Sequence, residues 1–192
     1  MQIDLSRITL ISVDFPRFFA DAKVPTRDFT RRASMASPAR PFAGGSPEAA
    51  RAFLESLLSS ESFDRTALEG LRDARFSDGR CRCAFPVGSE KTNRYGTLHG
   101  GCIATLVDVV STAALVTQSD HPGVSVNIDV AYMSPGPAGE EVQVDATVVK
   151  VGANLAFMAV LITSKDGKVI AKGNHTKYLP RTNTSAPRRA KL

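Results

Sequence analysis

The stretch from Asn93 to Thr117 constrains the fold of this chain more than any other part of the sequence. After His99 and two glycines, apolar residues occupy most positions through Val116, on every side of a helical projection. A helix that is apolar all round is wrapped by other elements rather than laid on a surface. We therefore predict a central buried helix that the rest of the chain covers.

Asp108 is the single charged residue of this predicted helix. A buried carboxylate without a partner costs several kcal/mol or takes up a proton. The residue is therefore either satisfied by polar neighbours or retained for chemistry, and acids of this kind gather at functional sites. We favour the chemical interpretation.

The spacing of His99 and Asp108 adds a geometric constraint. The two residues are nine positions apart, which is about two and a half helical turns and roughly 13 Å of axial rise. Their side chains point to opposite sides of the helix and cannot meet within one chain. If both serve one site, two copies of the protein must build it across a symmetric interface.

The remaining elements follow from hydrophobic periodicity. Ser46 and Pro47 are typical of a helix start, and an apolar face continues to about Ser59. Alternating patterns predict six strands, over residues 71–76, 80–87, 124–132, 141–151, 154–163 and 168–178. Because no crossover helices fit between the last four strands, we predict an α+β fold in which an antiparallel sheet curls around one long helix.

Three segments carry more specific expectations. The strand over 124–132 alternates apolar and polar residues, so we expect it to be half-buried, whereas 154–163 is apolar on both faces. Cys81 and Cys83 fall on one strand face with Phe85, and we interpret both cysteines as small packing residues.

The length of 192 residues fits one domain with tails. We expect a poorly ordered extension over 1–45, a domain over 46–180 and a flexible basic tail over 181–192. The extension contains four aspartates, which argues against an organelle transit peptide. Met35 as the true start is a second interpretation of this segment.

Charge and cysteine usage exclude several classes. The net charge is +5, but the predicted domain carries 13 Lys/Arg against 15 Asp/Glu and no basic stripe interleaved with aromatics. We therefore expect no nucleic-acid binding. The three cysteines and three histidines lack the spacing of a zinc site, and the apolar helix is too short and too polar for a membrane span.

The string NRYGTLHGG, followed seven residues later by Asp108, resembles the hotdog-fold acyl-CoA thioesterases of the phenylacetate-degradation type. The segments GVSVNIDVAYMSP and GKVIAKGNHTKYL extend the resemblance, which covers about residues 50–179. It implies a hotdog fold, in which an antiparallel sheet wraps a long central helix. It also implies hydrolysis of fatty or aryl acyl-CoA to free acid and coenzyme A, without metal or organic cofactor.

The same resemblance implies a homodimer with joined sheets and antiparallel helices, which pairs again into a tetramer. Active sites would lie at the dimer interface, in agreement with the helix geometry. Asn93 would hold the nucleophilic water or the thioester, His99 would orient or polarise the thioester carbonyl, and Gly100 would direct its backbone N–H at the carbonyl oxygen. The partner subunit's Asp108 would be the general base or nucleophile, and the partner subunit's Ser125 would position it or the water.

Structural roles fit these residue types as well. Asn93 is suited to capping a turn, His99 to a hydrogen-bonded position in the core, and Gly100 to close helix packing. Ser125 alternates with Val124 and Val126 and suits a polar strand face. His175 and His121 are assigned no role.

Substrate binding needs an apolar tunnel and phosphate contacts. The central helix and residues 154–163 can line the tunnel, and Lys91, Arg94 and Lys177 are candidates for the coenzyme A phosphates. Solvated surface cations are the alternative for these three.

The last three residues, Ala190-Lys191-Leu192, resemble the Ser-Lys-Leu peroxisomal address and follow two arginines. They predict a peroxisome or a related organelle, with mitochondrion and cytoplasm as alternatives.

A non-catalytic acyl-CoA binding or sensing module is the competing function. Retention of Asn93, His99 and Asp108 together favours the enzyme, since binding alone does not need the carboxylate. A hotdog dehydratase needs an acid–histidine pair arranged for water elimination, which this spacing does not supply.

Overall fold

The computed structural model of the chain describes residues 45–180. The predicted domain over 46–180 therefore falls within the described residues. The expectations for 1–44, including a start at Met35, and for 181–192, including the C-terminal tripeptide, lie outside them.

Two helices precede the sheet. α2 (Pro47–Ser59) begins as predicted, because the Ser46 Oγ accepts a hydrogen bond from the Ala49 N–H at 3.1 Å. Its buried face contains Ala50, Phe53 and Leu54. α3 (Phe63–Leu68) was not predicted, because six residues with a single buried position, Leu68, are too few to show a helical period.

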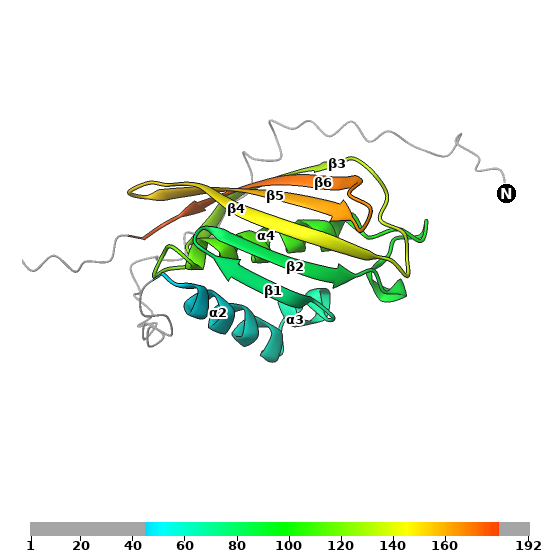
Figure 1. Cartoon of the computed structure of the whole chain (residues 1–192), viewed down its shortest axis with the longest axis horizontal. Helices are drawn as coiled ribbons and strands as arrows, with labels where there is room; N and C mark the ends of the chain where they lie inside the picture. The colour runs from blue at the N-terminus through cyan, green and yellow to red at the C-terminus, as the bar shows by residue number, and fades with distance from the viewer. Residues whose placement is uncertain (1–44, 181–192) are drawn as a thin grey trace, which may run out of the picture. The chain divides into compact units, whose positions relative to one another are not determined.

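All six strands form one antiparallel sheet in the order β1-β2-β4-β5-β6-β3, which confirms the α+β prediction (Figure 1). The strands are β1 (Arg72–Ser77), β2 (Arg80–Pro86), β3 (Val124–Tyr132), β4 (Glu141–Val151), β5 (Leu155–Ser164) and β6 (Val169–Tyr178). β3 pairs with β6 rather than with β4, the next strand along the chain. β1 and β3 are therefore the two edges.

The helix α4 (Gly100–Val116) is the predicted central helix and lies against the sheet (Figure 1). It contacts β2 to β6 on one side and α2 and α3 on the other, and 11 of its 17 residues are buried. A short 3-10 helix, η2 (Ser89–Lys91), precedes it. Gly173 of β6 allows the closest approach, since a Cβ there would lie 2.6 Å from both Cγ atoms of Val107.

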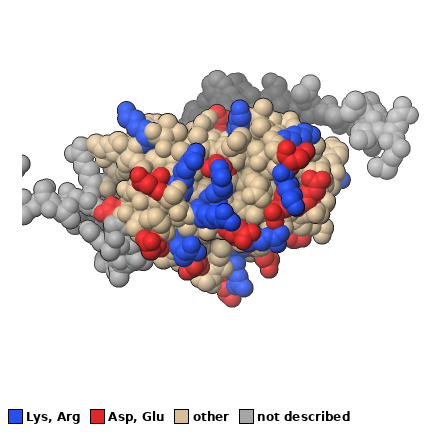
Figure 2. Space-filling model, in the orientation of Figure 1, with Lys and Arg blue, Asp and Glu red and all other residues tan. Residues whose placement is uncertain are grey.

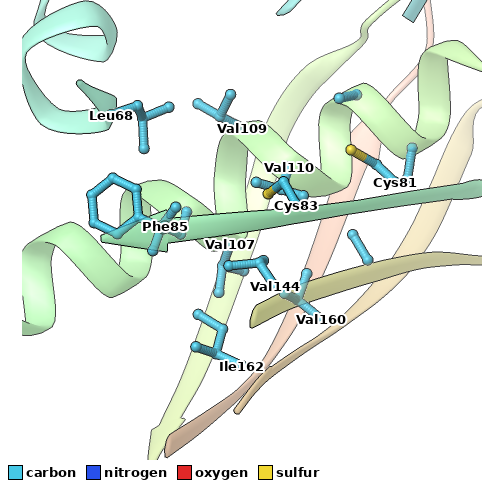
Figure 3. Close-up of a cluster of buried hydrophobic side chains, with 14 of the residues drawn as sticks. Leu68, Cys81, Cys83, Phe85, Val107, Val109, Val110, Val144, Val160 and Ile162 are labelled. Carbon is cyan, nitrogen blue, oxygen red and sulfur yellow. The ribbon is translucent and has the colours of Figure 1, made fainter. Parts of the chain in front are cut away.

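The core between α4 and the sheet includes the two strand cysteines (Figure 3). Cys81 and Cys83 are buried beside Phe85, which confirms that they pack as small apolar residues. Burial raises the pKa of Cys81 to about 12 and raises that of Cys83 further. Both thiols are therefore protonated and unreactive at neutral pH.

One expectation about burial was wrong for the single chain. β3 is exposed over most of its length, with Val124 61% and Val126 60% accessible, because an edge strand has a neighbour on one side only. β5 is apolar on both faces as predicted, but it is buried on its helix-facing side only, and its other face exposes Leu155, Phe157 and Leu161.

The surface shows no dominant sign of charge in Figure 2, where basic and acidic residues alternate over the visible face of the domain. Between residues 45 and 180, no helix is long and apolar enough to cross a membrane. Over the same range, no group of three His, Cys, Asp or Glu side chains could hold a metal ion.

Candidate active site

Asn93 organises the loop that leads into α4. Its Oδ1 accepts hydrogen bonds from the N–H groups of Tyr95 at 2.9 Å and Thr97 at 3.3 Å, and its Nδ2 donates to the Thr97 Oγ1 at 2.9 Å. Gly96, with φ of +72°, completes the turn. The turn-capping role of Asn93 is therefore present, and a role toward substrate stays a prediction.

His99 is the N-cap residue of α4. Its Nδ1 accepts a hydrogen bond from the Gly101 N–H at 2.9 Å, so in the neutral ring the proton lies on Nε2. The residue is exposed, which rules out the interpretation of His99 as a core histidine. The ring can therefore donate from Nε2 to a group outside the helix.

Gly100 occupies the first position of α4, where the backbone N–H has no acceptor within the helix. The Tyr132 Oη donates to the Gly100 carbonyl at 3.1 Å, and a Cβ at Gly100 would lie 3.3 Å from the Tyr132 ring. Gly100 therefore packs closely against Tyr132, and its backbone N–H also points out of the helix N-terminus. Such an N–H is suited to stabilising an oxyanion.

Asp108 lies two and a half turns further along, on the incompletely covered side of α4. Its side chain is 42% exposed, so the acid is only partly buried in the single chain. Its Oδ1 is 3.5 Å from the Ser125 Oγ, 3.7 Å from the His175 Nε2 and 3.9 Å from the Lys177 Nζ. We call these four side chains the Asp108 cluster.

A β-bulge brings Ser125 into the Asp108 cluster. Pairing between β3 and β6 shifts between Ser125 and Asn127, so that Ser125 lies opposite Lys177 and Ile128 lies opposite His175. The extra residue, Val126, changes the phase of the strand, and Ser125 turns toward α4. Simple alternation placed Ser125 and Ile128 on opposite faces, which is why the strand pattern alone suggested an ordinary surface serine.

His175 was assigned no role and is the buried centre of the polar network. Its fully buried ring contacts the Ser111 Oγ through Nδ1 at 2.7 Å and the Ser125 Oγ through Nε2 at 2.9 Å. Burial, reinforced by Lys177 and opposed by Asp108, lowers the pKa of His175 to about 4. The ring is neutral at pH 7 and links α4 to the bulged strand.

Lys177 also belongs to this network and not to the surface. Its side chain is 6% exposed, and its Nζ donates to the Thr112 Oγ1 at 3.0 Å and to the Ser125 Oγ at 3.3 Å. Burial lowers the pKa of Lys177, and Asp108 opposes that shift. This position is behind Asp108 and does not favour the expected contact with coenzyme A phosphates.

The other two phosphate candidates differ from each other. Lys91 is buried and its Nζ donates to the Thr66 carbonyl, a position that does not favour phosphate binding either. Arg94 is exposed, and its guanidinium carbon lies 4.7 Å from the centre of the Tyr95 ring. Arg94 is therefore the one member of the predicted trio, among the described residues, that can reach a solvent-borne phosphate.

The predicted residues form two separate groups in one chain. Asn93, His99 and Gly100 lie at the start of α4, whereas the Asp108 cluster draws its side chains from α4, β3 and β6. Over residues 45–180, no hydrogen bond or ion pair joins the two groups. The separation agrees with the helix geometry, which puts His99 and Asp108 on opposite sides.

Known proteins share this arrangement of sequence and fold. Residues 95–171 match the family model described as Thioesterase superfamily. Human acyl-coenzyme A thioesterase 13 is 43% identical over 131 residues, which are 67% of this chain and 93% of the relative. The chain belongs to the thioesterase superfamily.

Solved structures agree with membership of the thioesterase superfamily. Zebra fish thioesterase superfamily member 2 is 38% identical, with a TM-score of 0.65 over 70% of this chain and 99% of that one. A hypothetical thioesterase from Streptococcus pneumoniae, solved with coenzyme A, is 25% identical, with a TM-score of 0.58 over 62% of this chain and 92% of that one. The superfamily match ends at residue 171, so His175 and Lys177 of the Asp108 cluster lie beyond it.

The strand pattern contained a signal for these two residues. The predicted strand over 168–178 alternates, so His175 and Lys177 share a face with Gly173. Gly173 is also the residue that packs against Val107 of α4. That face of the strand therefore points at the central helix. His175 and Lys177 are the polar side chains on it that lie within reach of the helix.

Proposed function

We propose that this chain is an acyl-CoA thioesterase, which hydrolyses a fatty or aryl acyl-CoA to the free acid and coenzyme A in a site built by two subunits. The observation that carries the proposal is the Asp108 cluster, a half-exposed carboxylate held beside a serine hydroxyl. Similarity to human acyl-coenzyme A thioesterase 13 supports hydrolysis of an acyl-CoA thioester as the reaction. The S. pneumoniae structure, which was solved with coenzyme A, supports coenzyme A as the thiol portion of the substrate.

The chemistry divides between the two groups of residues. The Gly100 N–H, with the exposed His99 ring beside it, receives the thioester oxygen, which gains negative charge when water attacks the carbonyl carbon. Asp108 of the partner subunit takes a proton from that water, and the partner subunit's Ser125 orients it. The tetrahedral intermediate then expels coenzyme A thiolate, which is protonated to the thiol, and the acid is released.

Two features of β3 support a dimer. Within residues 45–180, β3 pairs with β6 alone, and it exposes the apolar residues Val124 and Val126. Joining the β3 edges of two subunits would extend the sheet and cover them. The exposed apolar residues of β5 offer a second surface for pairing of dimers into a tetramer.

Measurement of thiol release from a panel of aliphatic and aromatic acyl-CoAs tests the proposed reaction. We expect turnover of at least one class by purified protein, with Asp108→Asn as the matched inactive control. Saturable binding of acyl-CoA without thiol release would instead establish a non-catalytic binding module and contradict the proposal.

We also propose a peroxisomal location, supported by the tripeptide Ala190-Lys191-Leu192. An N-terminally tagged chain should give punctate fluorescence that disperses when residues 190–192 are deleted, with unchanged specific activity. Punctate fluorescence that survives the deletion would show that the tripeptide is not a signal.

A further inference from the structure

The ammonium of Lys177 lies in a pocket of oxygen atoms behind the catalytic candidate. Its Nζ donates hydrogen bonds to the Thr112 Oγ1 at 3.0 Å and the Ser125 Oγ at 3.3 Å, and it lies 3.9 Å from the Asp108 Oδ1 as an ion pair. Burying an ammonium is costly unless it is paired and hydrogen-bonded. A methionine would fill the same space without that cost, so packing alone does not account for a lysine.

The charge balance around Asp108 depends on this lysine. α4 contributes Ser111 and Thr112 to the network and β3 contributes Ser125, none of which is charged. β6 contributes His175, whose pKa of about 4 leaves it neutral at pH 7, and Lys177. Among the described residues, Lys177 is thus the single cation within ion-pair distance of the Asp108 carboxylate at neutral pH.

We propose that Lys177 is a positioning residue of the hydrolytic site, which holds the Asp108 carboxylate and the Ser125 hydroxyl in place beside each other. The inference rests on the proposed thioesterase function. A general base is effective only when it is held within reach of the water that it deprotonates. Lys177 is buried behind Asp108 and Ser125, so it acts through these two residues.

The variant Lys177→Gln tests this role, because glutamine removes the charge and keeps an N–H donor for Thr112 and Ser125. The matched control is Lys172→Gln, on the same strand but exposed on the opposite face of the sheet. Both kcat and KM for an acyl-CoA that the wild type hydrolyses are measured separately for all three proteins. Circular dichroism and gel filtration verify fold and oligomeric state.

We expect Lys177→Gln to lower kcat by about tenfold or more and to leave KM within about twofold, since small misplacements of a catalytic group can cost up to about a hundredfold in rate. Lys172→Gln should have the kcat and KM of the wild type. Because Lys177 acts through Asp108, adding Lys177→Gln to Asp108→Asn should lower kcat little further.

A folded Lys177→Gln with unchanged kcat, or with a raised KM alone, would overturn the proposal, and so would a full further loss in the Asp108→Asn background. If Lys177→Gln does not fold, Lys177→Met is judged by the same two comparisons. Failure of both variants to fold would assign Lys177 to the fold alone and also overturn it. Absence of thiol release by the wild type would reject the proposed function itself, a result separate from these.

Discussion

The buried, neutral His175 predicts that the folded protein loses stability in mild acid. An exposed histidine has a pKa of about 6.5, whereas the pKa of His175 in the fold is about 4. Between these two pKa values, this histidine is protonated in the unfolded chain and neutral in the folded chain. Stability is therefore fully present above about pH 6.5 and falls as the pH decreases to about 4, below which this residue adds no further loss.

The size of the loss follows from the same two values. Each unit of pKa difference is worth about 1.4 kcal/mol, so the shift to about 4 corresponds to an upper value of about 3 kcal/mol. This is a large part of the 5–15 kcal/mol that separates folded from unfolded states in most domains. The effect should therefore be measurable in the native protein.

Denaturant unfolding at fixed protein concentration, from pH 7.5 to pH 4.5, measures this contribution. The comparison is between the wild type and His175→Gln, which cannot ionise and can still hydrogen-bond to Ser125. Titrating groups that do not contact His175 are common to the two proteins and cancel in the difference. We expect the stability gap between them to narrow or reverse as pH falls, and parallel stability curves across this range would refute a buried neutral His175.

Two further predictions concern α4 and its contact with β6. Asp108→Asn should leave the protein folded and lower kcat by at least about a hundredfold, since general-base action supplies roughly 10²–10⁴ in rate; undiminished turnover in a folded variant would remove Asp108 from the mechanism. Gly173→Ala should destabilise the fold by about 1–3 kcal/mol in thermal or denaturant unfolding, because its Cβ would overlap Val107. Adding Val107→Ala should recover part of the loss, and a loss that is unchanged in the double variant would contradict this cause.

The sequence predicted the sheet and its central helix because their patterns are long. β3 and β4 have the predicted bounds, and α4 shows the apolar residues on all sides that were expected of it. The pairing of β3 with β6 was not predictable, since periodicity identifies strands but not their neighbours. α3 is too short to generate a period.

The candidate site was predicted in part. The geometric separation of His99 from Asp108 followed from helix dimensions alone. Ser125 was predicted from the resemblance and not from the strand pattern, because the bulge changes the phase of β3 and no local pattern shows that one strand residue is unpaired. His175 was missed although alternation along its strand puts it on one face with Gly173. Lys177 was predicted to contact a coenzyme A phosphate, with a solvated surface cation as the alternative, because lysine is seldom buried. The Asp108 carboxylate and two hydroxyls instead hold it inside.

Complementation between two inactive chains tests the two-subunit site most directly. Asn93→Ala should be inactive alone, because Asn93 orders the loop that carries His99 and is predicted to hold the thioester or the water. Asn93→Ala and Asp108→Ala are co-expressed with different tags, and dimers that carry both tags are verified. In a mixed dimer one interface receives both lesions, and the other receives intact Asn93 from one chain and intact Asp108 from its partner. With random pairing about half of the dimers are mixed, so roughly a quarter of normal thioesterase activity should return. Zero activity in a population with verified mixed dimers would contradict the account, because a site within one chain leaves a lesion in every subunit.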